Sequence, residues 1–170
     1  TANLAGLAGD DSYAVTLTGG GAGTVTVADT AGTDTLTVNG TGVANAFTLT
    51  DTAVTLGTEV VNSVVAEIET LTVDGKAGDD TYTVTGVTRT ATLTDAAGTD
   101  KVIAVDNVAT IALTDTSLTR AGLGTITLSG IEQADLTGGL GVNAFTVSSW
   151  TGTANLAGLA GDDSYAVTLT

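Results

Sequence analysis

Six residues in this sequence have the chemical type and the regular spacing from which a cation site could be built. A motif of the form Gly-x-Asp, or Gly-x-Asn in one case, precedes a stretch in which apolar and polar residues alternate. The residues at its third position are Asp11, Asp34, Asp80, Asp100, Asn143 and Asp163. Gly adopts backbone conformations that other residues avoid, and Asp or Asn can bond to its own turn backbone. The motif therefore predicts a tight turn followed by a strand.

Equivalent turns of neighbouring strands would lie about 4.8 Å apart. We expect three resulting pairs, which are Asp11 with Asp34, Asp80 with Asp100, and Asn143 with Asp163. Carboxylates at this distance repel each other unless they are protonated or bridged by a cation, and a site with only oxygen ligands suits Ca²⁺. The six residues are therefore candidate Ca²⁺ ligands. The alternative is that each side chain only caps its own turn and points to solvent.

The elements that position these residues belong to a long repeat. The segment 1–18 returns without a change as 153–170, which indicates a repeat of 152 residues. Residues 1–152 then form one complete unit, and residues 153–170 begin the next identical one. An overlap added to the ends of a single unit is the alternative, and it too implies a unit that abuts a copy of itself.

Inside the unit, a phrase of an apolar residue, any residue and then Gly or Asp recurs at intervals of 20 to 24 residues. Its first residues are Leu4, Val27, Leu49, Val73, Leu93, Leu113, Leu136 and, in the next unit, Leu156. This spacing predicts an all-β parallel β-helix (β-solenoid) of about seven turns per repeat. Seven turns at about 4.8 Å each would advance the chain by about 34 Å.

The third and sixth turns have longer tails, 55–69 and 120–132, and they lack the Gly-x-Asp motif. The tails resemble each other at an offset of 63 residues, which pairs Ile68 with Ile131 and Tyr82 with Phe145. We interpret the unit as an older duplication of unequal halves.

Composition excludes several classes of function. The chain has no Cys and no His, and its formal net charge is -15. Thiolate sites are thus excluded, the commonest general base is missing, and neither nucleic acid nor an anionic membrane is an expected partner. No apolar run approaches the roughly 18 residues that a membrane span needs. The four basic residues, Lys76, Arg89, Lys101 and Arg120, are scattered, so we do not expect an enzyme.

The segments 6–13 and 138–145 resemble the haemolysin-type calcium repeat, G-G-x-G-x-D-x-U-x, although these motifs do not follow one another directly. The chain as a whole resembles the giant β-strand-repeat surface proteins and adhesins of prokaryotes. This resemblance implies a secreted parallel β-solenoid with calcium held in its stacked turns.

The expected function is that of a structural repeat in a long extracellular fibre, stalk or giant adhesin, with copies of the chain joined end to end. The alternative is a binding module that recognises ice or carbohydrate, because Thr-x-Thr pairs are frequent. On the seven-turn frame, however, Asp74 and two Ala residues interrupt the outward row of threonines. That row reads Ala5, Ala28, Thr50, Asp74, Thr94, Thr114 and Thr137.

Overall fold

The computed structural model describes residues 1–63 and 66–168. Within these residues the protein is all-β, with 18 strands arranged in two sheets of nine and no helix. Sheet I has the order β1 (Ala2–Ala5), β3 (Ala22–Ala28), β7 (Thr58–Asn62), β6 (Ala53–Leu56), β5 (Ala46–Leu49), β9 (Thr81–Val84), β11 (Lys101–Val105), β15 (Gln133–Thr137) and β17 (Thr153–Ala157). Sheet II has the order β2 (Ser12–Thr16), β4 (Thr35–Asn39), β8 (Thr70–Asp74), β10 (Thr90–Thr94), β14 (Ile126–Ser129), β13 (Ser117–Arg120), β12 (Thr110–Thr114), β16 (Ala144–Val147) and β18 (Ser164–Val167).

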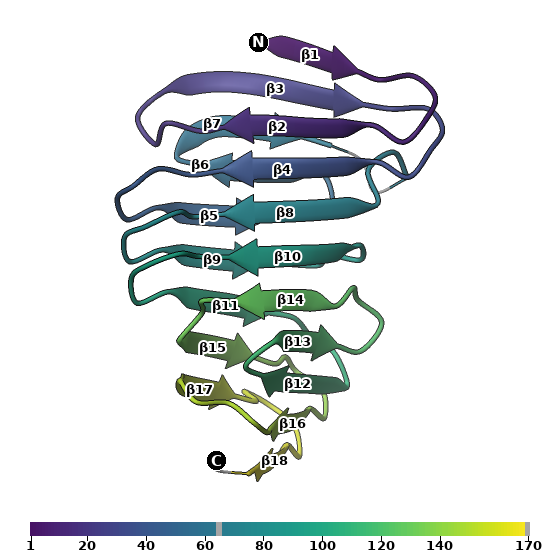
Figure 1. Ribbon diagram of the computed structural model, residues 1–170. Helices are drawn as coiled ribbons and strands as arrows, with labels where there is room; N and C mark the ends of the chain where they lie inside the picture. The colour runs from purple at the N-terminus through teal and green to yellow at the C-terminus, as the bar shows by residue number, and fades with distance from the viewer. Residues whose placement is uncertain (64–65, 169–170) are drawn as a thin grey trace.

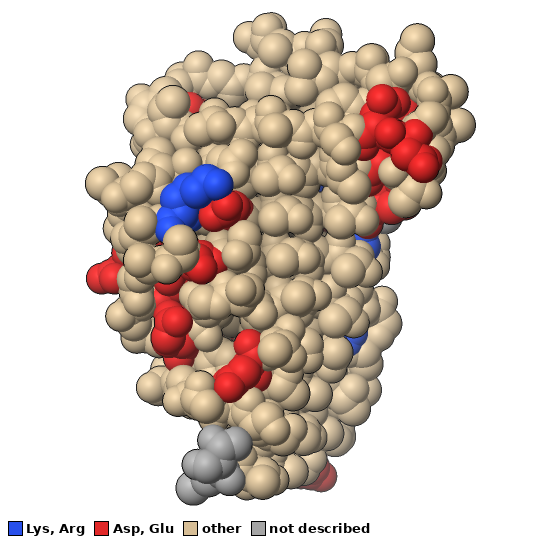
Figure 2. Space-filling view, viewed as in Figure 1, with Lys and Arg blue, Asp and Glu red and all other residues tan. Residues whose placement is uncertain are grey.

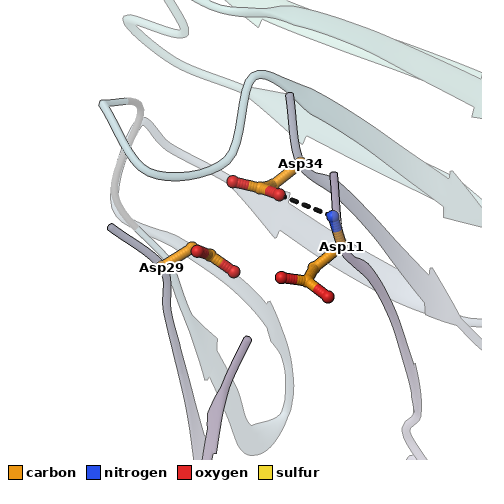
Figure 3. Close-up of side chains that lie close together, drawn as sticks. All are labelled: Asp11, Asp29 and Asp34. Carbon is orange, nitrogen blue, oxygen red and sulfur yellow. Dashed lines mark hydrogen bonds between the residues drawn. The ribbon is translucent and has the colours of Figure 1, made fainter. Parts of the chain in front are cut away.

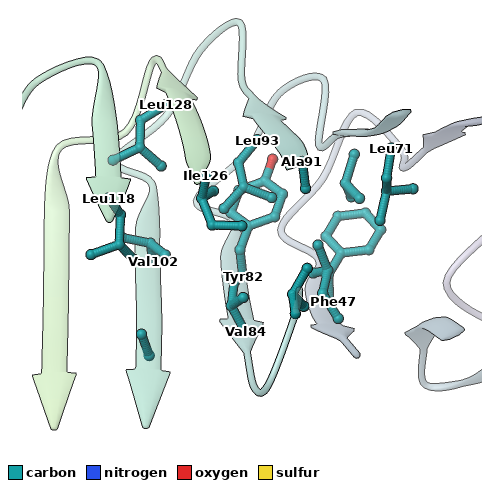
Figure 4. Close-up of a cluster of buried hydrophobic side chains, with 14 of the residues drawn as sticks. Phe47, Leu71, Tyr82, Val84, Ala91, Leu93, Val102, Leu118, Ile126 and Leu128 are labelled. Atoms are coloured by element: carbon teal, nitrogen blue, oxygen red, sulfur yellow. The ribbon is translucent and has the colours of Figure 1, made fainter. Parts of the chain in front are cut away.

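The strands form because apolar and β-branched residues alternate with Thr along most of them. In β8, for example, Leu71 and Val73 are fully buried while Thr70 and Thr72 face outward. Parallel pairing aligns such residues, and Leu71 lies between Leu36 of β4 and Ala91 of β10. The apolar side chains meet between the two sheets and form one thin core (Figure 4).

The chain passes from one sheet to the other after most strands, so the two sheets lie face to face and the two termini lie at opposite ends of the stack (Figure 1). This architecture is compatible with a β-solenoid. Two segments depart from the predicted uniform parallel pairing, because β5–β6–β7 and β12–β13–β14 are antiparallel meanders within a single sheet. Both sheets are therefore mixed.

The meanders account for the longer third and sixth turns. Each long tail alternates over enough residues to supply one additional strand, β6 or β13, and Gly57 with a φ of 60° closes the turn between β6 and β7. Residues 64–65 of the first tail lie outside the described residues. The two meanders lie in opposite sheets, as do Tyr82 of β9 and Phe145 of β16. The halves of the older duplication thus exchange sheets.

The number of strand positions per repeat differs from the predicted seven turns. β1 and β17 occupy the first and last of the nine positions in sheet I, so they are eight strand spacings apart. The extra position arises because each meander adds one strand to its own sheet. The axial advance is therefore about 38 Å rather than about 34 Å.

Because the described chain has no helix, none of its segments qualifies as a helical membrane span.

Candidate metal centres

Acidic side chains gather along the two lateral edges of the stack, where the chain crosses between the sheets (Figure 2). Crossings into sheet II lie at one edge, and crossings into sheet I lie at the other (Figure 1). Two groups of three carboxylates lie there, one at each edge. We call Asp11, Asp29 and Asp34 the N-terminal cluster, and Asp80, Asp95 and Asp100 the central cluster.

The N-terminal cluster is formed by three turns that neighbouring strands bring together. Asp11 and Asp34 stand directly before β2 and β4, which pair in parallel, and Asp29 follows β3. One carboxylate oxygen from each residue lies within 4.8 Å of the others. The amide of Asp11 donates to Oδ1 of Asp34 at 2.7 Å (Figure 3). The predicted pair is therefore adjacent, and its carboxylate caps a neighbouring turn.

The central cluster repeats this arrangement at the opposite edge. Asp80 and Asp100 precede the parallel strands β9 and β11, and Asp95 follows β10. The amide of Asp80 donates to Oδ1 of Asp100 at 2.7 Å, and the amide of Asn45 donates to Oδ1 of Asp80 at 2.5 Å. All three carboxylates are at least nine-tenths buried.

A glycine and a tyrosine complete each cluster. The Tyr82 hydroxyl accepts from the amide of Gly75 at 2.9 Å and donates to Oδ2 of Asp95 at 2.8 Å. A Cβ on Gly75 would overlap Oδ2 of Asp80, Oδ2 of Asp95 and the Tyr82 hydroxyl, so only glycine fits there. In the N-terminal cluster, Gly6, Tyr13 and Asp29 make the equivalent contacts.

Each cluster contains a carboxylate oxygen that lacks a partner. Oδ2 of Asp11 and Oδ2 of Asp80 are buried and have no hydrogen-bond partner among the described residues. Asp80 is only 1% exposed, and burial is the main cause that raises its pKa to about 7. Hydrogen bonding to Asp95 and the negative charges of Asp95 and Asp100 act in the same direction. Such an oxygen needs either a proton or a cation.

The other carboxylates respond to the same causes. Burial also raises the pKa of Asp100, and burial with the charges of Asp29 and Asp34 raises that of Asp11. The pKa of Asp29 is lowered, chiefly by the hydrogen bond that it accepts from Tyr13.

The donor set fits a hard divalent cation. Every candidate ligand is a carboxylate oxygen, which Ca²⁺ prefers. Two oxygens bound to one Ca²⁺ at about 2.3–2.6 Å lie at most about 5 Å apart, and the 4.8 Å limit in both clusters satisfies this condition. Ca²⁺ takes about six to eight ligands, so the three carboxylates would share it with water.

The third predicted pair is also adjacent, but it differs chemically. The amide of Asn143 donates to Oδ1 of Asp163 at 2.8 Å. The Asn143 side chain is occupied locally, since its Nδ2 donates to the Val108 carbonyl and its Oδ1 accepts from the amide of Gly139. Gly158 stands where the clusters have Asp29 or Asp95, so this pair contributes a single carboxylate.

Sequence reasoning missed Asp29 and Asp95 as members of the clusters. Both end the recurring apolar-x-Gly/Asp phrase, which therefore contained the signal. It also missed two glutamates that extend the pattern by one strand, since the amide of Asp34 donates to Glu69 at 2.8 Å and that of Asp100 donates to Glu132 at 2.9 Å.

The outer face of sheet II has regular rows of hydroxyl groups. The longest row runs across six neighbouring strands in register: Thr37, Thr72, Thr92, Thr127, Ser117 and Thr114. A second row contains Thr35, Thr70 and Thr90. The interrupted row expected on the seven-turn frame does not exist, because its residues are divided between the two sheets.

The four basic residues have structural contacts. Lys76 pairs with Asp74 at 2.5 Å and Lys101 with Asp135 at 3.1 Å, both at the surface. Arg120 is buried and pairs with Asp106 at 2.6 Å, whereas buried Arg89 donates to Oγ of Ser63 at 2.9 Å.

Comparison with known proteins gives no match to a family model, to a curated protein or to a solved structure.

Proposed function

We propose that this chain is a structural tandem repeat of a long extracellular fibre, stalk or giant adhesin, and that copies assemble end to end as a continuous β-solenoid. The proposed role is mechanical rather than enzymatic. One observation carries the proposal: the identical segments 1–18 and 153–170 occupy the two ends of the same stack and run in the same direction. A unit of this kind can be extended without a change of architecture.

The two ends of the stack support this proposal. Outer strands offer unpaired backbone groups, which are templates for a further strand. At the C-terminal end, Tyr165 and Val167 of β18 are about half exposed, although their equivalents in the interior are buried. A cavity between Trp150, Leu156 and Val167 opens at the same end. Another copy placed there would cover these apolar groups.

Electron microscopy of the purified 170-residue chain, over a range of concentrations, tests the fibre role. We expect unbranched filaments, and in their diffraction an axial spacing of about 4.8 Å together with a repeat of about 38 Å. Particles that remain single at every concentration and ionic strength would contradict it.

We further propose that the two acidic clusters bind Ca²⁺ or a similar divalent cation. The buried, unpartnered Oδ2 of Asp80 among three convergent carboxylates supports this proposal. Calorimetric titration with CaCl₂ tests it, with Asp80→Asn as the variant and Asp79→Asn as the matched control. Asp79 is exposed and lies outside the cluster, where it caps the amide of Thr99 at 2.9 Å. Equal heats of binding for the two variants would contradict a site in the central cluster.

A surface-binding role is the second candidate, and the hydroxyl rows of sheet II favour it. Six hydroxyl residues in register on a sheet face form a regular polar lattice, which suits ordered water in ice or an extended carbohydrate. Thermal hysteresis of the wild-type protein, compared with a Thr72→Lys variant, tests the ice-binding form. Equal freezing behaviour of the two would remove this form of the candidate.

A further inference from the structure

The repeated segment has the same conformation at both ends of the stack. Gly9 and Gly161 have φ of 122° and 121°, and Leu7 and Leu159 have φ of 79° and 70°. Each copy forms two strands, β1 with β2 or β17 with β18, over the part that the structure describes. The segment therefore folds in the same way whether its neighbours lie on one side or on the other.

The C-terminal copy shows how the segment sits on the preceding strands. β17 pairs with β15, placing Leu156 beside Leu136, and β18 pairs with β16, placing Tyr165 beside Phe145. The two aromatic rings stack at 5.2 Å. Asn155 donates to Oδ1 of Asp135 at 2.7 Å. We call the surface formed by β15 and β16 the rear seat.

The N-terminal copy shows how the segment sits on the strands that follow it. β1 pairs with β3 and β2 pairs with β4, which places Tyr13 beside Leu36. We call the surface formed by β3 and β4 the front seat. Each copy thus fills one seat and leaves its other edge free, although a single copy has the edges to fill both.

The order of side chains at the lateral edges decides how two chains can join. In the interior, the residues before four neighbouring strands of sheet I read Ala44-Asn45, Asp79-Asp80, Thr99-Asp100 and Ile131-Glu132. A doubly acidic turn thus has a neutral turn on one side and a singly acidic turn on the other. At the opposite edge, Asp10-Asp11 is followed by Thr33-Asp34 and Ile68-Glu69, and Val142-Asn143 precedes Asp162-Asp163.

Direct stacking of one chain on the next would break this order. It would place Asp162-Asp163 against Asp10-Asp11, with four carboxylates on adjacent strands about 4.8 Å apart. Like charges directly opposite each other destabilise strand pairing. If a single copy fills both seats, the order becomes Val142-Asn143, Asp10-Asp11, Thr33-Asp34, Ile68-Glu69. This order matches the interior one.

We propose that two copies of this chain join by strand exchange, in which one of the two identical end segments is displaced and the other fills the rear seat of one chain and the front seat of the next. The inference rests on the proposed fibre function. The number of strand pairs is unchanged by the exchange, and 18 residues regain conformational freedom. Joining is then limited by the local opening of an end segment.

Matched variants of the full chain test the exchange. One variant carries Leu4→Ser with Tyr13→Ser, a second carries Leu156→Ser with Tyr165→Ser, and a third carries all four changes. None alters the net charge. Circular dichroism and thermal melting verify that the rest of each chain is folded, and sedimentation velocity follows assembly.

Strand exchange predicts that either two-site variant assembles faster than the wild type, by about tenfold or more, because one seat is already vacant and need not be opened. The four-site variant should remain monomeric. A synthetic peptide with the sequence of residues 1–18 should stop the growth of the two-site variants, and the same peptide with both serines should not.

Direct stacking predicts the opposite, because it needs both copies. If the wild type assembles and each two-site variant is as inactive as the four-site variant, strand exchange is wrong and the fibre function stands. If no chain assembles at all, including the wild type and the two-site variants, the proposed end-to-end fibre itself fails.

Discussion

The two acidic clusters have nearly the same residues but different surroundings. Each has three aspartates, a tyrosine that donates to one of them and a glycine that no other residue could replace. In the central cluster Asp80 is 1% exposed, and Tyr82 stacks on Phe47 at 5.4 Å. In the N-terminal cluster Asp11 and Tyr13 are only partly buried.

The difference arises from one neighbouring strand. Asn45 and Phe47 of the first meander cover the central cluster, whereas within this chain no strand lies on the outer side of β2. Asn143 and Phe145 give the same cover to Asp163 and Tyr165, which are the second copies of Asp11 and Tyr13. Burial, and with it proton affinity, is therefore set by the preceding strand rather than by the acidic residues themselves.

The largest expected effect comes from removing that cover. Phe47→Ala should lower the free energy of unfolding by about 3–5 kcal/mol, because a buried aromatic ring is lost and Tyr82 and Asp80 become accessible to water. Phe145→Ala should cost less, since its partner Tyr165 is already half exposed. Urea unfolding curves measure both. An equal loss in the two variants would contradict the comparison.

The glycine of the covered cluster should be nearly as sensitive. Gly75→Ala should destabilise the protein by about 2–4 kcal/mol, because the added methyl group forces buried carboxylates apart. Gly6→Ala should cost less, since Asp11 can move toward solvent. Gly42→Ala, whose added methyl group meets no atom within 4 Å, is the control. The order of the three melting temperatures gives the test.

Divalent cations should reduce the contrast between the clusters. A saturating concentration of Ca²⁺, about 100 times the dissociation constant, should stabilise the fold by about 2.7 kcal/mol per site, and a chelator should remove this gain. Asp80→Asn and Asp11→Asn should reduce the gain more than Asp51→Asn does. Asp51 lies outside both clusters and caps Thr88. Melting curves that coincide with Ca²⁺ and with chelator, at matched ionic strength, would disprove the cation sites.

The smallest expected effect is the dependence of stability on pH without divalent cations. Because the folded-state pKa of Asp80 is raised from 3.8 to about 7, the folded state holds this proton more tightly than the unfolded state. The stabilisation is complete below pH 3.8 and is lost as the pH rises through about 7. Asp80→Asn should flatten the melting temperature in this window, while Asp79→Asn should not. Identical profiles for both variants would count against the assigned proton.

The sequence predicted the strands and the motif pairs correctly because both depend on local patterns. Alternation fixes which residues of a strand face inward, and the Gly-x-Asp motif fixes where a strand begins. The neighbouring turns follow from the repeat spacing. Asp11 thus came to lie beside Asp34, and Asp80 beside Asp100.

The meanders and the third aspartate of each cluster could not be predicted in the same way. An alternating tail such as 55–69 can continue a turn or fold back, and the choice depends on which strand it meets in the sheet. Asp29 and Asp95 follow a strand of the opposite sheet, so their approach to the motif residues depends on how the two sheets face each other. The row of threonines was misplaced for the same reason, since the seven-turn frame changes sheet at each meander.

The meanders also have a consequence for how the chain folds. Only three residues separate β5 from β6 and two separate β12 from β13, whereas the parallel partners β2 and β4 begin 23 residues apart. Short loops close at lower entropic cost, and antiparallel hairpins form within about 1–10 μs. Each sheet therefore contains one strongly local nucleus, on which the slower parallel strands can add from both sides. In an array of such repeats, nuclei would alternate between the two sheets along the axis, so folding could start in many places and spread until neighbouring regions meet.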